Sequence, residues 1–154
     1  MTVAAAALAC AAFLEGYPSP IYDAHGYWVL STVLRAHGLS TWPVDFRTYG
    51  YPLFAAAVTG FRDVSPEAMR LAAFLAQLAI HLAACALVAR RLAAILRSPR
   101  AGLLAYAVGA LNPALLVHTT EVLSDLLSAV LIQLAVAFSW RLPDPPPPPA
   151  RPRR

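Results

Sequence analysis

Residues 68–89, "AMRLAAFLAQLAIHLAACALVA", form a long apolar run that decides the fold class of this chain. A helix needs about 20 mainly apolar residues to cross the hydrocarbon core of a bilayer, and this run is long enough. The chain is 59% hydrophobic and only 13% charged, whereas soluble domains carry about 25% charged residues. Its abundant Ala and Leu favour helix. The sequence therefore predicts an all-α, polytopic membrane protein.

Three more apolar segments complete the predicted membrane domain, which covers residues 1–141. They lie near 2–14, 101–117 and 124–140, so that four spans are expected, with a long loop at 15–67. Asn112-Pro113 interrupts the third segment, because a proline inside a helix kinks or ends it. Residues 142–154, rich in Pro and Arg, cannot pack a core and are predicted to form a disordered tail.

The charges predict which segments share a side of the membrane. Residues 90–100 and 141–154 hold eight of the 12 Arg and one acid, whereas residues 15–70 and 118–125 hold seven of the eight acids. The positive-inside rule places the Arg-rich segments, and both termini, in the cytoplasm. The basic residues then serve topology and anionic lipid headgroups, so nucleic acid is not an expected partner.

The predicted loop contains two shorter segments with helical features. Residues 20–37 follow Ser19, which suits an N-cap, and precede Gly38, which suits a helix stop. We expect them to form an amphipathic helix along the membrane surface. The run 51–61, "YPLFAAAVTGF", is too short to span alone and forms either a second surface helix or a re-entrant segment.

The stretch "YDAHGY" at residues 22–27 concentrates polar groups near the outer face. Asp23 is a candidate general base toward a hydroxyl or amine, and Tyr27 lies one helical turn later. The alternative is an Asp favoured by the helix dipole beside an interfacial Tyr. His25 points elsewhere on a helix and is either a ligand or merely solvated.

Three more charged residues are candidates for binding. Arg47 could pair with a phosphate, or it could serve topology or pair with Asp45. Glu121 and Asp125 are four residues apart, so a helix would place both carboxylates on one face, where they could bind a divalent cation. Alternatively they are charges at the N-terminal end of the fourth span.

Polar residues within the apolar runs are expected to serve packing. Gln77 and His81 lie four residues apart in the 68–89 run, and such residues usually face the bundle and bond neighbouring helices. An intramembrane ionisable group is otherwise a functional candidate. Cys10 and Cys85 both lie in apolar runs, where we expect core residues and neither a disulfide nor a metal site.

Taken in order, these features resemble the N-terminal portion of the C superfamily of membrane glycosyltransferases. These are polyprenyl-phosphate-sugar-dependent enzymes related to protein mannosyltransferases and aminoarabinose transferases. The resemblance covers nearly residues 1–141 through loose motifs: "YDAHGYWVLSTVLRAHGL", "FRTYGYPLFAAAV", "LNPALLV" and "HTTEVLSD". It implies a multi-pass protein of the bacterial inner membrane and a polyprenyl-phosphate-linked sugar as donor.

The resemblance also implies roles for single residues. Asp23 corresponds to the catalytic base, and Glu121 or Asp125 to a second acid near the metal or acceptor. Arg47 would lie near the donor phosphate. Many relatives carry two adjacent acids in the first motif, whereas Ala24 follows Asp23 here, which leaves metal dependence open.

Length separates this chain from the family. Relatives have roughly twice as many spans or more, so we expect this chain alone to be inactive and a C-terminal half or partner subunit to supply the rest. Two alternatives stay open: a small non-catalytic membrane protein, such as a scaffold or transporter subunit, and a degenerate, truncated remnant.

Overall fold

The computed structural model describes residues 1–15, 21–39, 50–120 and 124–140, with only the helical backbone at 21–24. Within these ranges the chain is all-helical and contains no strand. The seven helices are α1 (Thr2–Leu14), α2 (Ile21–His37), α3 (Gly50–Val58), α4 (Pro66–Ile95), α5 (Pro99–Ala110), α6 (Pro113–Thr119) and α7 (Ser124–Ser139). The expected all-α fold class is therefore confirmed.

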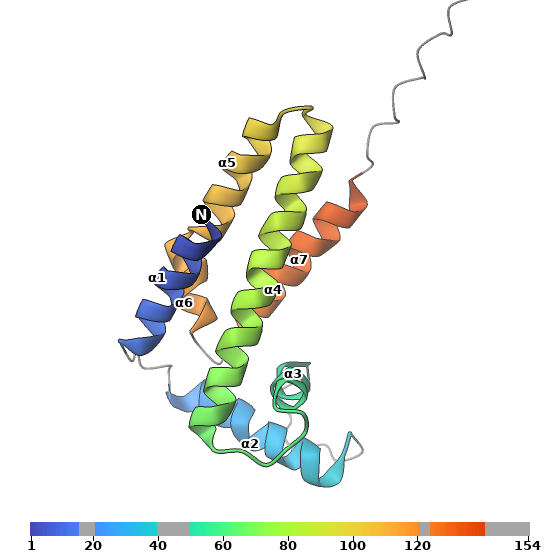
Figure 1. Cartoon of the computed structure of the whole chain (residues 1–154). Helices are drawn as coiled ribbons and strands as arrows, with labels where there is room; N and C mark the ends of the chain where they lie inside the picture. The colour runs from blue at the N-terminus through green and yellow to red at the C-terminus, as the bar shows by residue number, and fades with distance from the viewer. Residues whose placement is uncertain (16–20, 40–49, 121–123, 141–154) are drawn as a thin grey trace, which may run out of the picture.

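Helix α4 is the centre of the molecule, and α1, α3, α5, α6 and α7 all contact it. Figure 1 shows α4 and α5 as a long hairpin, with α1, α6 and α7 beside its lower part. Helix α2 runs crosswise under the beginning of α4, next to α3. The molecule thus has two different ends: the α2–α3 end, and the hairpin end, where α4 turns into α5.

Three helices begin with the same pair of residues, a polar cap followed by proline. The hydroxyl of Ser65 accepts a hydrogen bond from the Ala68 amide at 3.2 Å, and Ser98 accepts one from Ala101 at 3.3 Å. Asn112 accepts from the amides of Ala114 and Leu115 at 3.0 and 3.3 Å. Such caps satisfy amides that lack a partner inside the helix, and proline suits the first helical position because it has no amide proton to satisfy. The sequence therefore fixes where α4, α5 and α6 start.

The break expected at Asn112-Pro113 is present. Helices α5 and α6 are bent by 53° there, and only together are they long and apolar enough to cross a membrane. Among the described residues, α4 is the one single helix that meets this criterion, while α1 and α7 are shorter apolar helices. Helix α4 is also longer than the expected 68–89, because it continues through Arg90 and Arg91 to Ile95.

The two segments expected in the loop are both helical. Helix α2 matches the expected 20–37, and Gly38 ends it with a φ of 68° while its amide bonds to Leu34 O at 2.8 Å. Its inner face buries Leu30, Ser31 and Leu34, whereas Ala36 is exposed. The 51–61 run forms α3, which ends at Val58. The expected cap Ser19 and tail 142–154 lie outside the described residues.

Small residues let α4 and α5 approach closely. A Cβ at Gly102 would lie 2.7 Å from Ala93 Cβ and 2.8 Å from Ala89 O, and one at Gly109 would lie 2.9 Å from Cys85 Sγ. Close approach of this kind lets helices pack by van der Waals contact where no hydrophobic force acts between them. At the other side of α4, the Phe13 ring of α1 stacks on Phe74 with centroids 4.4 Å apart.

Candidate functional site

Helix α2 carries the first group of candidate residues. Asp23 lies in its first turn, and its side chain is outside the described residues. His25 is exposed, with its ring centroid 5.7 Å from that of Trp28. Tyr27 is half-buried and faces the other helices. The structure therefore places His25 and Tyr27 in different surroundings on α2.

Tyr27 brings three helices together. Its ring centroid lies 4.8 Å from that of Tyr51 in α3, and its hydroxyl lies 3.3 Å from the Ser124 hydroxyl at the start of α7. Ser124 directly precedes Asp125, which is exposed in the first turn of α7. The helix that contains Asp23 and the helix that contains Asp125 consequently meet at one end of the molecule.

A buried chain of hydrogen bonds continues from this point into the bundle. The Tyr51 hydroxyl donates to Gln77 Oε1 at 2.7 Å, and Gln77 Nε2 donates to the Thr119 carbonyl at 3.0 Å. Burial, and to a lesser degree the neighbouring Tyr27, raises the pKa of Tyr51 above its ordinary value. Tyr51 is therefore held as a neutral phenol that donates its proton to Gln77.

Gln77 and His81 lie where the packing interpretation places them. Both are buried, and Gln77 bonds α3 and α6, so its predicted role between helices is confirmed. His81 is fully buried with its Nε2 3.8 Å from Cys85 Sγ. Cys85 is buried as expected, but Cys10 is exposed on α1, which corrects the expectation that both are core residues.

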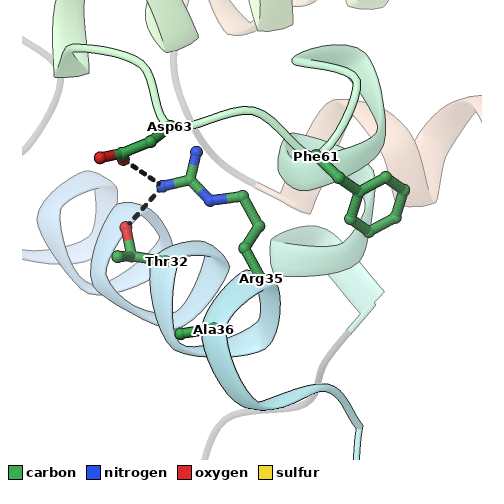
Figure 2. Close-up of a pocket in the computed structure, with 5 residues that line it drawn as sticks. All are labelled: Thr32, Arg35, Ala36, Phe61 and Asp63. Carbon is green, nitrogen blue, oxygen red and sulfur yellow. Dashed lines mark hydrogen bonds and ion pairs between the residues drawn. The ribbon is translucent and has the colours of Figure 1, made fainter.

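Arg35 is a central residue of this end that sequence reasoning missed. Its guanidinium donates to Thr32 Oγ1 at 3.0 Å, to Asp63 Oδ1 at 3.1 Å and to the Arg62 carbonyl. Figure 2 shows Arg35 rising from α2 toward Asp63. The spacing of Arg35 from Thr32 is a helical signal, but Asp63 lies 28 residues away, so only the tertiary structure reveals the pair.

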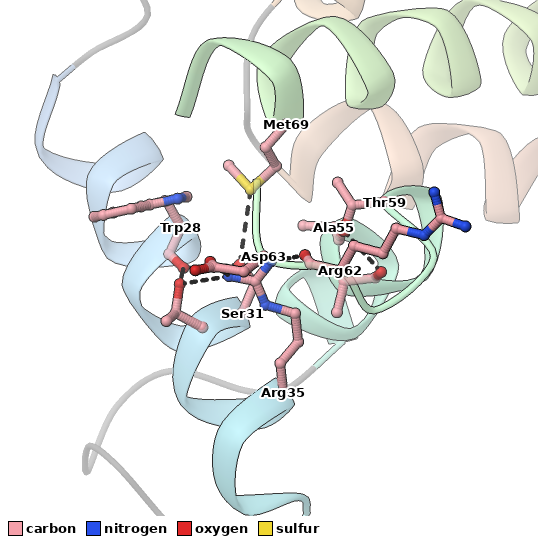
Figure 3. Close-up of polar contacts among 10 residues, drawn as sticks. Trp28, Ser31, Arg35, Ala55, Thr59, Arg62, Asp63 and Met69 are labelled. Atoms are coloured by element: carbon pink, nitrogen blue, oxygen red, sulfur yellow. Dashed lines mark hydrogen bonds and ion pairs between the residues drawn. The ribbon is translucent and has the colours of Figure 1, made fainter. Parts of the chain in front are cut away.

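Arg35 thereby fastens the α3–α4 connection to α2, and Ser31 links α2 to the beginning of α4. The Ser31 hydroxyl contacts Met69 Sδ at 3.7 Å, as seen above the guanidinium in Figure 3. Beside Arg35 lies an open pocket of about 280 Å³, lined also by Thr32, Ala36, Phe61 and Asp63. Gly60 and Phe61 both adopt positive φ, 63° and 57°, where the chain leaves α3.

The predicted roles of Arg47 and Glu121, and the predicted binding of a cation, are not tested by this geometry. Arg47 and Glu121 lie outside the described residues, so neither the phosphate contact nor the Glu121–Asp125 pairing can be placed. Among the residues that the structure describes, no group of three or more His, Cys, Asp or Glu could hold a metal ion. Glu121 and Asp125 therefore stay predictions as cation ligands.

The α2–α3 end can be summarised by its chemistry. It combines the backbone position of Asp23, an exposed Asp125, and the phenol and hydroxyl of Tyr27 and Ser124, all beside an Arg-stabilised turn. A carboxylate at such a place can accept a proton from a hydroxyl or amine. Comparison of the chain with protein-family models, with curated proteins and with solved structures finds no match.

Proposed function

We propose that the chain is a multi-pass membrane protein whose spans are α1, α4, the bent α5–α6 pair and α7. Large apolar side chains on the outside of these helices support the proposal. Leu103, Leu104 and Val108 of α5 are 60–65% exposed, and Leu131, Ile132 and Phe138 of α7 are 58–66% exposed. Soluble monomers rarely expose contiguous apolar patches of this kind, whereas a bilayer covers them without cost.

The two ends of the molecule then lie on opposite sides of the membrane. The hairpin end carries Arg90, Arg91, Arg97 and Arg100, and the sequence between residues 68 and 120 contains no acid. By the positive-inside rule this end is cytoplasmic. The α2–α3 end lies outside, where the crosswise, amphipathic α2 occupies the boundary between lipid and water.

Labelling of single cysteines tests this topology. Starting from a variant without Cys10 and Cys85, Ala36→Cys and Asp125→Cys should react with a membrane-impermeant maleimide in intact cells. Ala94→Cys, exposed near the hairpin end, should react only after the membrane is opened. Reaction of Ala36→Cys and Asp125→Cys from opposite sides would contradict the proposed site.

For the α2–α3 end we propose the acceptor side of a glycosyltransferase that uses a polyprenyl-phosphate-linked sugar. In this reaction the acceptor oxygen or nitrogen attacks the anomeric carbon, the bond to the phosphate breaks, and polyprenyl phosphate leaves. Asp23 takes the proton of the acceptor. The observation that carries the proposal is the Tyr27–Ser124 contact of 3.3 Å, because it joins the helices of the two acidic motifs on which the family resemblance rests.

The test is transfer of labelled sugar from polyprenyl-phosphate mannose or aminoarabinose to membrane acceptors. We expect no transfer by the purified chain alone and transfer when a detergent extract of the source membranes is added. Asp23→Asn should lower this transfer by at least a hundredfold. Glu67→Gln, which removes an exposed acid at the same end, should leave it unchanged.

Unchanged transfer by Asp23→Asn would reject the base role. Correct topology without any transfer would instead favour the small non-catalytic membrane protein. The labelling and transfer experiments therefore separate the membrane proposal from the enzyme proposal.

A further inference from the structure

A groove runs along the outside of the α4–α5 hairpin, far from the α2–α3 end. It has a volume of about 380 Å³, and its walls are almost entirely apolar. Its lining includes Ala86, Ala93, Gly102, Leu103 and Tyr106, with Arg90 as the one charged member. In the membrane proposed above, this groove faces lipid.

The groove follows from the small residues that join the two helices. Gly102 lies directly against Ala89 and Ala93, so the backbones approach while no large side chain fills the space beside the contact. Leu103 lines this groove and is 60% exposed. Tyr106, another lining residue, is tied to α1 by a 2.7 Å hydrogen bond between its hydroxyl and Thr2 Oγ1.

The charge around the groove is one-sided. Arg90 is exposed at the groove, and Arg91, Arg97 and Arg100 follow it in the sequence, from the end of α4 to the start of α5. No acid occurs between residues 68 and 120 to neutralise them. An apolar groove with the exposed Arg90 in its lining is complementary to a molecule with an anionic head and an apolar chain.

We infer that this groove binds one anionic phospholipid. The acyl chain lies along the alanines and Gly102, and the phosphate pairs with Arg90, whose guanidinium suits phosphate oxygens. Basic pockets between membrane helices on the cytoplasmic side commonly bind anionic headgroups.

The inference depends on membrane insertion of the hairpin but not on sugar transfer. It is tested by titrating the detergent-solubilised chain with fluorescent phosphatidylglycerol. We expect saturable binding of one lipid per chain, and weaker binding of phosphatidylcholine, whose head is neutral overall. Glycerol phosphate should not compete, because it lacks the acyl chain.

Two variants and two matched controls locate the site. Arg90→Gln should weaken phosphatidylglycerol binding about five-fold, as expected for one Arg near an anionic surface. Ala86→Phe should fill the groove and weaken it at least as much. Arg62→Gln removes the same charge at the opposite end, and Ala83→Phe adds the same ring on an exposed face of α4 outside the groove, so neither should change binding.

Three outcomes would overturn the inference. Equal affinity for the two lipids would exclude the charged contact, and competition by glycerol phosphate would exclude the acyl groove. Equal effects of Arg90→Gln and Arg62→Gln would assign the binding to overall charge. Cysteine labelling and circular dichroism of each variant show whether insertion and folding are intact. The lipid-binding result can therefore be interpreted even if the transferase proposal fails.

Discussion

Different interactions stabilise the two ends of the molecule. At the α2–α3 end, side-chain contacts join separate segments: Tyr51–Gln77 joins α3 to α4, and Arg35–Asp63 joins α2 to the α3–α4 connection. At the hairpin end, Gly102 and the facing alanines join two nearly parallel helices by close backbone contact. The packing of the α2–α3 end depends on paired hydrogen-bonding groups, and the packing of the hairpin end depends on small side chains between the helices.

This difference teaches where each kind of substitution will be tolerated. The hairpin end should accept exchanges between apolar residues on its outside but no added atom between the helices. The α2–α3 end should accept changes of volume on exposed positions but no loss of a hydrogen-bonding partner. Four substitutions or conditions test this contrast, beginning with the largest expected effect.

Gly102→Ala should be the most destabilising of these substitutions. The added Cβ would meet Ala93 Cβ at 2.7 Å and a backbone oxygen at 2.8 Å, and overpacking of this kind costs about 1–3 kcal/mol. We expect a loss of about 3 kcal/mol in the free energy of unfolding in mixed micelles. Gly50→Ala, which meets nothing within 4 Å, is the control and should be neutral. Equal stability of both variants would refute close packing at the hairpin.

Gln77→Leu should destabilise the chain by about 2 kcal/mol, because it leaves the Tyr51 hydroxyl and the Thr119 carbonyl buried without this partner. Gln133→Leu is the matched control. Within the described part of the chain, the buried Gln133 Oε1 has no hydrogen-bond partner, so its removal should be neutral or stabilising. Unfolding of both variants in the same micelles measures the difference. A larger loss for Gln133→Leu would contradict the polar network.

Arg35→Met should loosen the α2–α3 end by about 1–2 kcal/mol, because three donated hydrogen bonds are lost. Asp63→Asn should cost less than about 0.5 kcal/mol, since an exposed ion-pair partner contributes little. Asp63 is 94% exposed, whereas Arg35 is only 9% exposed. Limited proteolysis within residues 59–65 reports this loosening. Equal cleavage of Asp63→Asn and Arg35→Met would show that the ion pair, rather than the neutral contacts, holds the turn.

Alkaline pH should weaken the α2–α3 end through Tyr51, with the smallest of the four expected effects. Burial raises the pKa of Tyr51 in the folded state, so folding favours the protonated phenol. Stability should stay constant up to the unfolded pKa of about 10 and fall above it, by up to about 1.4 kcal/mol per pH unit. Comparing unfolding at pH 9 and 11 measures this. Tyr51→Phe, although less stable at neutral pH, should not show the additional fall.

The sequence predicted helices well where local signals determine them. Asn112 followed by proline marks the start of α6, and Gly38 marks the end of α2. Both signals are local, because a cap or a left-handed residue determines a helix end within one helical turn. The apolar run 68–89 is shorter than the helix that contains it, Pro66–Ile95. Arg90 and Arg91 ended the apolar pattern, but Arg favours helix, so α4 continues beyond the point where its hydropathy drops.

The candidate site could be predicted only in part, because its contacts join distant segments. Tyr27 was singled out from its spacing to Asp23, but its contact with Ser124 spans 97 residues and has no signature in the sequence. Arg35 was missed for the same reason. Helical periodicity identifies which residues share a face, whereas the partner of that face depends on how the helices pack.

The length of α4 has a mechanical consequence for the surroundings of the protein. Its 30 residues extend about 45 Å, whereas the hydrocarbon layer is about 30 Å thick. Tilting alone would have to exceed the usual limit of about 40° to hide the excess. In the bilayer proposed above, the end of α4 near Arg97 should therefore stand clear of the acyl region, within reach of trypsin added on that side, while thicker bilayers should shield it.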